Sequence, residues 1–188
     1  MSARIALALV HHPVLDAAGA ITTTAITNLD VHDLARSAKT FGATELFVVH
    51  PIEAQRQLVD RIREHWLHGS SGRRIPARKA ALELVRAVPS LGDAVVALGG
   101  RQHVELWITA AREVAPPVSF SEARALLSDA SRTVLLVFGT GWGLAAPVVD
   151  DADRVLPPVR AEFDSKYNHL SVRAACAIIL DRLRGERG

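Results

Sequence analysis

Residues 133–144 read TVLLVFGTGWGL, and this stretch decides what kind of fold the chain can adopt. Its first half, 133–138, is a continuous apolar run with the length of a buried β-strand. Its second half places glycines at positions 139, 141 and 143, which let the backbone approach a ligand closely. In α/β proteins ligands collect at the carboxyl ends of the strands, so this loop is the first candidate for a binding site.

Other apolar runs along the chain predict further buried strands. They lie at 4–10, 45–49, 94–98 and 106–109. Helical patterns alternate with them at 30–42, 55–66, 77–88, 119–127 and 171–184. At the first of these helices Asp30 is the expected N-cap, and Ser119 with Glu122 has the spacing of a capping box. Strands that are apolar throughout and alternate with helices predict an α/β fold with a mostly parallel sheet flanked by helices.

Composition narrows the class of protein. The 188 residues are expected to form a single domain over 1–188. A lone Cys176 excludes a disulfide scaffold, and no apolar run reaches the roughly 18 residues of a membrane span. No signal peptide is recognisable, so we expect a cytoplasmic protein. With 22 basic against 20 acidic side chains, the chain is not a general nucleic-acid coat.

Two nucleotide-binding interpretations of the glycine loop fail on its own residues. A dinucleotide fingerprint needs a fourth glycine where Leu144 stands, and a helix start where Pro147 follows. A phosphate-binding P-loop needs Lys and then Ser or Thr after its last glycine, and neither is present. A nucleotide-dependent oxidoreductase is therefore disfavoured. Two interpretations of the glycine loop stay open: a loop that binds a ligand, and a tight turn whose glycines serve packing alone.

Three segments in order resemble the SPOUT class of S-adenosylmethionine-dependent RNA methyltransferases. They are 28–42 (NLDVHDLARSAKTFG with its leading Asn28), 135–144 and 168–180. The likeness is closer to a bacterial subgroup of small, stand-alone SPOUT proteins, which share HPVLD at 12–16, TAITNLD at 24–30 and YNHLSVR at 167–173. The resemblance covers nearly the whole chain.

The resemblance implies a C-terminal trefoil knot that binds S-adenosylmethionine and releases S-adenosylhomocysteine, with contacts made mostly by backbone groups. It also implies a homodimer that pairs through the knot. The residues that match the family's cofactor positions are Thr109, Ala110, Phe138, Gly139, Thr140, Gly141, Trp142, Gly143, Leu156, Pro157, Leu170 and Ser171.

Three residues are candidates for the catalytic step. Arg36 matches the arginine of the first motif, which in some members contacts the RNA phosphate or activates the target. Asn28 stands on a polar loop at a helix start, and Asp164 precedes the third motif as an acid or base. Each has a structural alternative: a solvent-facing helix charge for Arg36, a turn residue for Asn28 and an exposed loop carboxylate for Asp164.

The basic stretch 68–78 (HGSSGRRIPAR) is the expected contact with RNA. Arg73, Arg74, Arg78 and Lys79 form the one dense basic cluster of the sequence, on a segment predicted to be a flexible loop. Contact with phosphates is the functional interpretation, and a solvated loop is the alternative. His11 and His12 are adjacent and would face opposite sides of a strand, and His65 and His68 have helical spacing but no obvious third ligand. No metal is therefore expected.

These observations predict an RNA methyltransferase that uses S-adenosylmethionine on tRNA or rRNA. The alternative is a non-catalytic knot protein that binds RNA or S-adenosylmethionine. Trp142 stands in the second motif where many ribose-methylating relatives carry Glu, and 170–173 (LSVR) departs from their third motif. Both departures weaken an expectation of 2′-O-methylation, while base methylation stays open.

Overall fold

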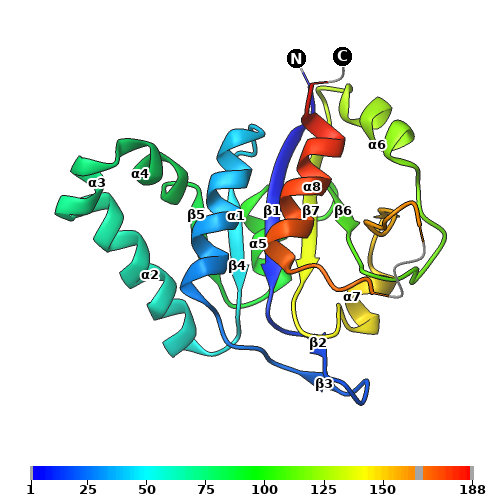
Figure 1. Cartoon of the computed structure of the whole chain (residues 1–188), viewed down its shortest axis with the longest axis horizontal. Helices are drawn as coiled ribbons and strands as arrows, with labels where there is room; N and C mark the ends of the chain where they lie inside the picture. Colours follow the sequence, from blue (N-terminus) through cyan, green and yellow to red (C-terminus); the bar gives the residue numbers. More distant parts are fainter. Residues whose placement is uncertain (1, 164–166, 187–188) are drawn as a thin grey trace.

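The computed structural model describes residues 2–163 and 167–186 and is built on a six-stranded sheet (Figure 1). In spatial order the strands are β5 (Val85–Val88), β4 (Leu46–Val49), β1 (Arg4–Val10), β7 (Thr133–Gly139), β6 (Val104–Ile108) and β8 (Arg154–Val155). Every pairing within this sheet is parallel. The predicted α/β fold with a mostly parallel sheet is therefore confirmed.

The central pair of the sheet is β1 with β7. The two strands are in register over seven residues, from Arg4 opposite Thr133 to Val10 opposite Gly139. Side chains of β1 alternate between two cores, because successive residues of a strand point to opposite faces. Leu7 and Leu9 enter the core on one face, and Ala6 and Ala8 enter the core on the other.

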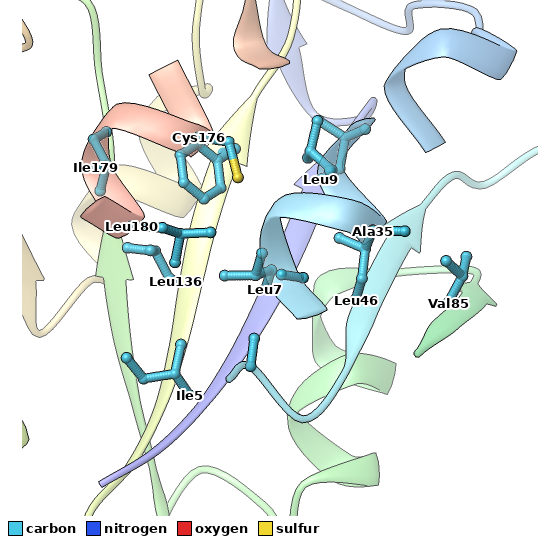
Figure 2. Close-up of a cluster of buried hydrophobic side chains, with 14 of the residues drawn as sticks. Ile5, Leu7, Leu9, Ala35, Leu46, Val85, Leu136, Cys176, Ile179 and Leu180 are labelled. Carbon is cyan, nitrogen blue, oxygen red and sulfur yellow. The ribbon is translucent and has the colours of Figure 1, made fainter. Parts of the chain in front are cut away.

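Helices α1 (Asn28–Thr40) and α8 (Val172–Arg184) lie side by side across one face of the sheet, with α6 (Phe120–Leu127) beside α8 (Figure 1). Leu7, Leu136 and Leu180 belong to this core, and Figure 2 shows Leu136 next to Leu180 below α8 and Leu7 below α1. Cys176 is buried in the same core, and burial raises the pKa of its thiol to about 12. Its expected place in the core is confirmed.

The opposite face is covered by α5 (Leu91–Ala97) and α7 (Ala146–Asp150), whose buried side chains join the second core. Helices α2 (Glu53–His68), α3 (Ser70–Arg74) and α4 (Pro76–Leu82) extend beyond β5 at the left of Figure 1. A short hairpin of β2 (Val14–Leu15) and β3 (Ile21–Thr22) follows the end of β1. Within the described parts of the chain, no helix has the length and apolarity needed to cross a membrane.

Several local predictions are wrong. The run 94–98 belongs to helix α5, which begins at a capping box between Ser90 and Asp93. The predicted helix 77–88 ends at Leu82, and its second half pairs with β4 as β5. The predicted flexible loop 68–78 is mostly helical, in α3 and α4. Thr27, not Asp30, caps α1, because its side chain accepts the Asp30 backbone N–H.

The packing predicts a large loss of stability on substitution Leu136→Ala. Leu136 is fully buried at the centre of the sheet, so we expect a cavity that lowers the free energy of unfolding by about 3 kcal/mol in a urea titration. The matched change Leu29→Ala, at a side chain that is 63% exposed, should alter it by less than about 0.5 kcal/mol. Equal effects of the two substitutions would contradict this description of the core.

Candidate functional site

A cavity of about 700 Å³ lies at the carboxyl ends of β6 and β7, against the start of α8. Its walls come from segments that are far apart in the sequence: 108–112 after β6, 138–144 after β7, and 168–172 at the start of α8. The floor is apolar, and includes Ile108, Phe138 and Ile179. The cavity lies at the strand ends where the sequence predicted a ligand site.

The glycine loop depends on backbone conformations that other residues rarely adopt. Gly141 has φ of +59° and Gly143 has φ of +113°, both in the left-handed region. At Gly139, a Cβ atom would lie 2.9 Å from the side chain of Leu144. The three glycines therefore allow this loop to fold back tightly along one wall of the cavity.

The β2–β3 hairpin holds the glycine loop from outside. The Trp142 N–H donates to the Leu15 carbonyl at 3.0 Å, and the Leu15 N–H donates to the Gly143 carbonyl at 2.9 Å. The Ala145 N–H donates to the Pro13 carbonyl at 3.2 Å. Residues 12–16 (HPVLD) therefore hold the glycine loop in place.

A chain of hydrogen bonds behind the loop joins it to the histidines of the strand ends. The Thr140 hydroxyl donates to the Val10 carbonyl at 3.1 Å. The Thr24 hydroxyl lies 2.5 Å from that of Thr140 and 3.0 Å from His11 Nδ1. Because the Thr140 hydroxyl donates its proton to Val10, the Thr24 hydroxyl donates to the Thr140 oxygen. The Thr24 oxygen then accepts from His11, so His11 Nδ1 carries a proton.

Burial makes His11 a weak base. It is 1% exposed, and burial, together with the neighbouring His50, lowers its pKa from 6.5 to about 4. Its Nε2 has no hydrogen-bond partner among the described residues. His50 is also buried, and its pKa is lowered by burial. Both rings are therefore neutral at neutral pH, and in residues 2–163 and 167–186 no three His, Cys, Asp or Glu side chains group as metal ligands.

Asp30 brings a carboxylate to the cavity. It is 8% exposed and is the one acidic residue among the described residues that line the cavity. Its Oδ2 accepts from the Thr27 hydroxyl at 2.6 Å, and its Oδ1 accepts from Arg173 Nη1 at 2.8 Å. Arg173 also lies 3.5 Å from Asp33. This ion pair ties α1 to α8 at the edge of the cavity.

The mouth of the cavity is polar and basic. It includes Arg112, Arg160 and His169. Arg160 pairs with Glu113 at 3.2 Å. Asn168 Nδ2 donates to the Ala111 carbonyl at 2.8 Å, which joins the segment before α8 to the segment after β6.

Most of the predicted cofactor residues come together at this cavity. Ten of the twelve line it, namely Thr109, Ala110, Phe138, Gly139, Thr140, Gly141, Trp142, Gly143, Leu170 and Ser171. Leu156 and Pro157 do not line it. Leu156 is fully buried in the core, where its N–H donates to the Ile108 carbonyl at 2.9 Å.

The predicted catalytic residues do not come together there. Asn28 and Arg36 are exposed on α1 and do not line the cavity, and Arg36 lies 4.0 Å from Asp33. Asp164 lies outside the described residues. The sequence indicated Asp30 only as a helix cap and not as a site residue, because an acidic residue in the first turn of a helix is ordinary. Its partner Arg173 is 143 residues away, and no local pattern connects the two.

The predicted RNA contacts lie on the helices beyond β5. Arg73 and Arg74 are exposed on α3, and the Arg78 guanidinium stacks over the Trp66 ring at 5.0 Å, next to Lys79. Residues 53–82 contain seven Arg and Lys and three Asp and Glu, whereas the whole chain has a net charge of only +2. We call α2, α3 and α4 together the basic lobe.

A parallel sheet whose strand ends open into an apolar cavity beside a glycine loop defines an α/β cofactor-binding protein. This chain belongs to the SAM-dependent RNA methyltransferase family, whose family model matches residues 4–185. Nearly all of the described sheet and the whole cavity fall within that match.

Two relatives bear on the site. A tRNA (guanine-N(1)-)-methyltransferase of Nitratidesulfovibrio vulgaris is 41% identical over 180 residues, which are 95% of this chain and 41% of that protein. An uncharacterized protein of Aquifex aeolicus is 36% identical over 180 residues, covering 94% of this chain and 86% of that one. The chain thus spans about two-fifths of the length of the named tRNA methyltransferases that it matches.

The fold has a solved counterpart in the TrmH/SpoU tRNA modifying enzyme of Aquifex aeolicus. The TM-score is 0.58 at 14% identity, and the match covers 96% of this chain and 73% of that one. At this level of identity the likeness concerns the fold. The predicted resemblance to the SPOUT class is confirmed.

The buried histidines predict a stability that decreases in acid. Because His11 has a lower pKa folded than its ordinary 6.5, the unfolded chain binds more protons between about pH 6.5 and 4, and stability falls as the pH is lowered through that window. The loss from His11 is about 3 kcal/mol by pH 4, and His50 adds in the same direction.

Urea titrations at several pH values measure this slope. We expect His11→Asn to flatten it, because the titrating ring is gone, whatever the substitution does to stability at neutral pH. His103→Gln, at an exposed histidine outside the network, should leave the slope as it is. An unchanged slope in His11→Asn would show that His11 is not the source of the acid-dependent loss of stability.

Proposed function

We propose that this chain transfers a methyl group from S-adenosylmethionine to RNA, with tRNA as the first substrate to test and rRNA as the second. The observation that carries the proposal is the cavity itself, in which ten family-matched residues from three distant segments meet. tRNA comes first because two relatives are named as tRNA methyltransferases. Since the chain matches about two-fifths of each, we do not assign it guanine N1 as the target atom.

The residues of the cavity suit this donor. Its volume of about 700 Å³ lies within the usual range of small-molecule sites. The apolar floor at Ile108 and Phe138 suits an adenine ring, and the glycine loop forms the wall beside it. Asp30, which is paired with Arg173, is the acidic group that the described lining contains. When bound, S-adenosylmethionine supplies an electrophilic methyl group carried on a sulfonium sulfur.

The chain contributes orientation more than bond-making groups. Methyl transfer needs the two reactants in line, so a loop fixed from both sides lowers the entropic part of the barrier. The hairpin holds the glycine loop from outside, and Thr140 holds it from the sheet. Thr27 and Arg173 orient the Asp30 carboxylate before any ligand arrives.

Asn28 and Arg36 can have catalytic roles only if the protein forms a dimer. Neither residue lines the cavity of its own chain, so a second chain would have to bring them to it. A homodimer, a C-terminal knot and a role for Asp164 each stay a prediction from the resemblance. Localisation in the cytoplasm also stays a prediction.

The alternative is a protein that binds RNA or S-adenosylmethionine without catalysis. The same observation favours it, namely that Asn28 and Arg36 do not meet the glycine loop within one chain. The two functions are separated by following labelled methyl groups from S-adenosylmethionine into unmodified tRNA and rRNA transcripts. Label in either RNA supports the enzyme, whereas donor binding without any transfer supports the alternative.

Donor binding is expected to weaken when the cavity is filled. Ala175 lines it from α8, so Ala175→Leu should lower the affinity for S-adenosylmethionine by about 10-fold in calorimetry, because the added side chain occupies ligand space. The control Ala125→Leu, on the exposed face of α6, should bind as the wild type does. If Ala175→Leu binds with unchanged affinity, the donor lies elsewhere.

RNA affinity is expected to depend on the basic lobe. The double substitution Arg73→Glu and Arg74→Glu should weaken tRNA binding by about 10-fold and reduce the slope of log affinity against log salt by about 2, because two phosphate contacts are lost. The matched double change Arg124→Glu and Arg182→Glu, on α6 and α8, should have less effect. Equal losses of tRNA affinity in the two double variants would mean that the basic lobe is not the main RNA-binding surface.

A further inference from the structure

Trp142 is a large side chain that the fold leaves outside its core. It lines the mouth of the cavity and is 65% exposed, whereas Trp107 is fully buried and Trp66 is half-buried under Arg78. Tryptophan carries more apolar surface than most side chains, and burying it is strongly favourable. A scattered exposed apolar residue needs no explanation, but this one stands at a binding site.

The backbone on both sides of Trp142 is fixed. Gly141 and Gly143 adopt left-handed conformations, and a Cβ at Gly141 would lie 2.9 Å from the Leu15 carbonyl. The Trp142 N–H is bonded to that same carbonyl, so the residue is held between the hairpin and the loop. An aromatic surface that is already held in place loses little freedom when a ligand covers it.

The lining of the cavity contains two kinds of surface. One is buried and apolar, with Phe138 1% and Leu144 7% exposed, and suits the adenine of the donor. At the level of the mouth the same cavity has Arg112, and Arg160 with its partner Glu113. A cavity lined by both an exposed aromatic ring and cationic side chains matches a nucleotide, which has a flat base and an anionic phosphate.

We propose that the indole of Trp142 is the stacking surface for the base of the acceptor nucleotide, with Arg112 and Arg160 placed to meet its phosphates. The proposal rests on the proposed function and deepens it by assigning the acceptor subsite. A base turned out of an RNA stack offers its face to an aromatic side chain, and this contact tolerates any base. Trp142 therefore contributes affinity for the extruded nucleotide, while the identity of the base is selected by other contacts.

Fluorescence of the full chain tests the stack without turnover. The probe is a short single-stranded RNA of mixed sequence, added to protein with and without S-adenosylhomocysteine. We expect the RNA to quench tryptophan emission in the wild type and in Trp66→Phe, and the quench to be lost in Trp142→Phe. Emission that responds to S-adenosylhomocysteine alone would place the donor, not the acceptor, on the indole and overturn the proposal.

Kinetics give the second measurement. With unmodified tRNA transcripts, Trp142→Ala should raise KM for RNA by about 10-fold, the value of one lost base stack, and Trp142→Phe should restore most of it. The KM for S-adenosylmethionine should rise by less than the KM for RNA in both variants, because the apolar residues Ile108 and Phe138 are untouched. An RNA KM that is unchanged in Trp142→Ala would overturn the stacking role and leave the methyltransferase intact.

The two proposals fail in different ways. If the wild type transfers no methyl group but the RNA quench depends on Trp142, the acceptor subsite stands as a binding site and the enzymatic function fails. If emission changes only with protein concentration and not with RNA, a second copy of the chain covers Trp142 and the subsite fails.

Discussion

The parallel pairing of β1 with β7 is the constraint on which the rest of this structure depends. It joins residues 4–10 to residues 133–139 through seven residues in register, at the centre of the sheet. At the carboxyl end of the two strands, the Thr140 N–H and the Thr140 hydroxyl both donate to the Val10 carbonyl, 130 positions away in the sequence. The glycine loop thus leaves the sheet with its first residues already fixed, and the histidine network and the hairpin pack against a loop that the strands have placed.

A second long-range contact sets the other wall of the cavity. Asp30 and Arg173 pair across α1 and α8, and the pair is shielded from solvent at its acidic end. Buried ion pairs add little net stability, since desolvation offsets most of their attraction. The Asp30–Arg173 pair lies at the cavity, and it holds the two helices at one separation. It also keeps the Asp30 carboxylate in one orientation before a ligand binds.

Local patterns in the sequence identified the parts of this fold that local physics determines. Strands β1 and β7 stood out as apolar runs, and α6 stood out through its Ser119–Glu122 capping box. The segment AVVAL at 94–98 was misread because five apolar residues fit a buried strand or a helix face equally well, and the deciding signal, the capping box at Ser90, lies before it. The glycine loop was predictable because its three glycines lie within residues 139–143. Asp30 with Arg173 was not, because only the packed helices bring the two together.

The same long-range pairings determine when during synthesis the cavity can exist. Its walls draw on α1 near the start of the chain and on α8 near the end of the described residues, and the central strand pair also needs both halves. Sheets built from such distant pairings fold slowly, because a long loop must close before its contacts stabilise it. A ribosome must therefore release most of the sequence before any ligand can bind, and until then the apolar β1 strand is without its central partner and open to association with other chains.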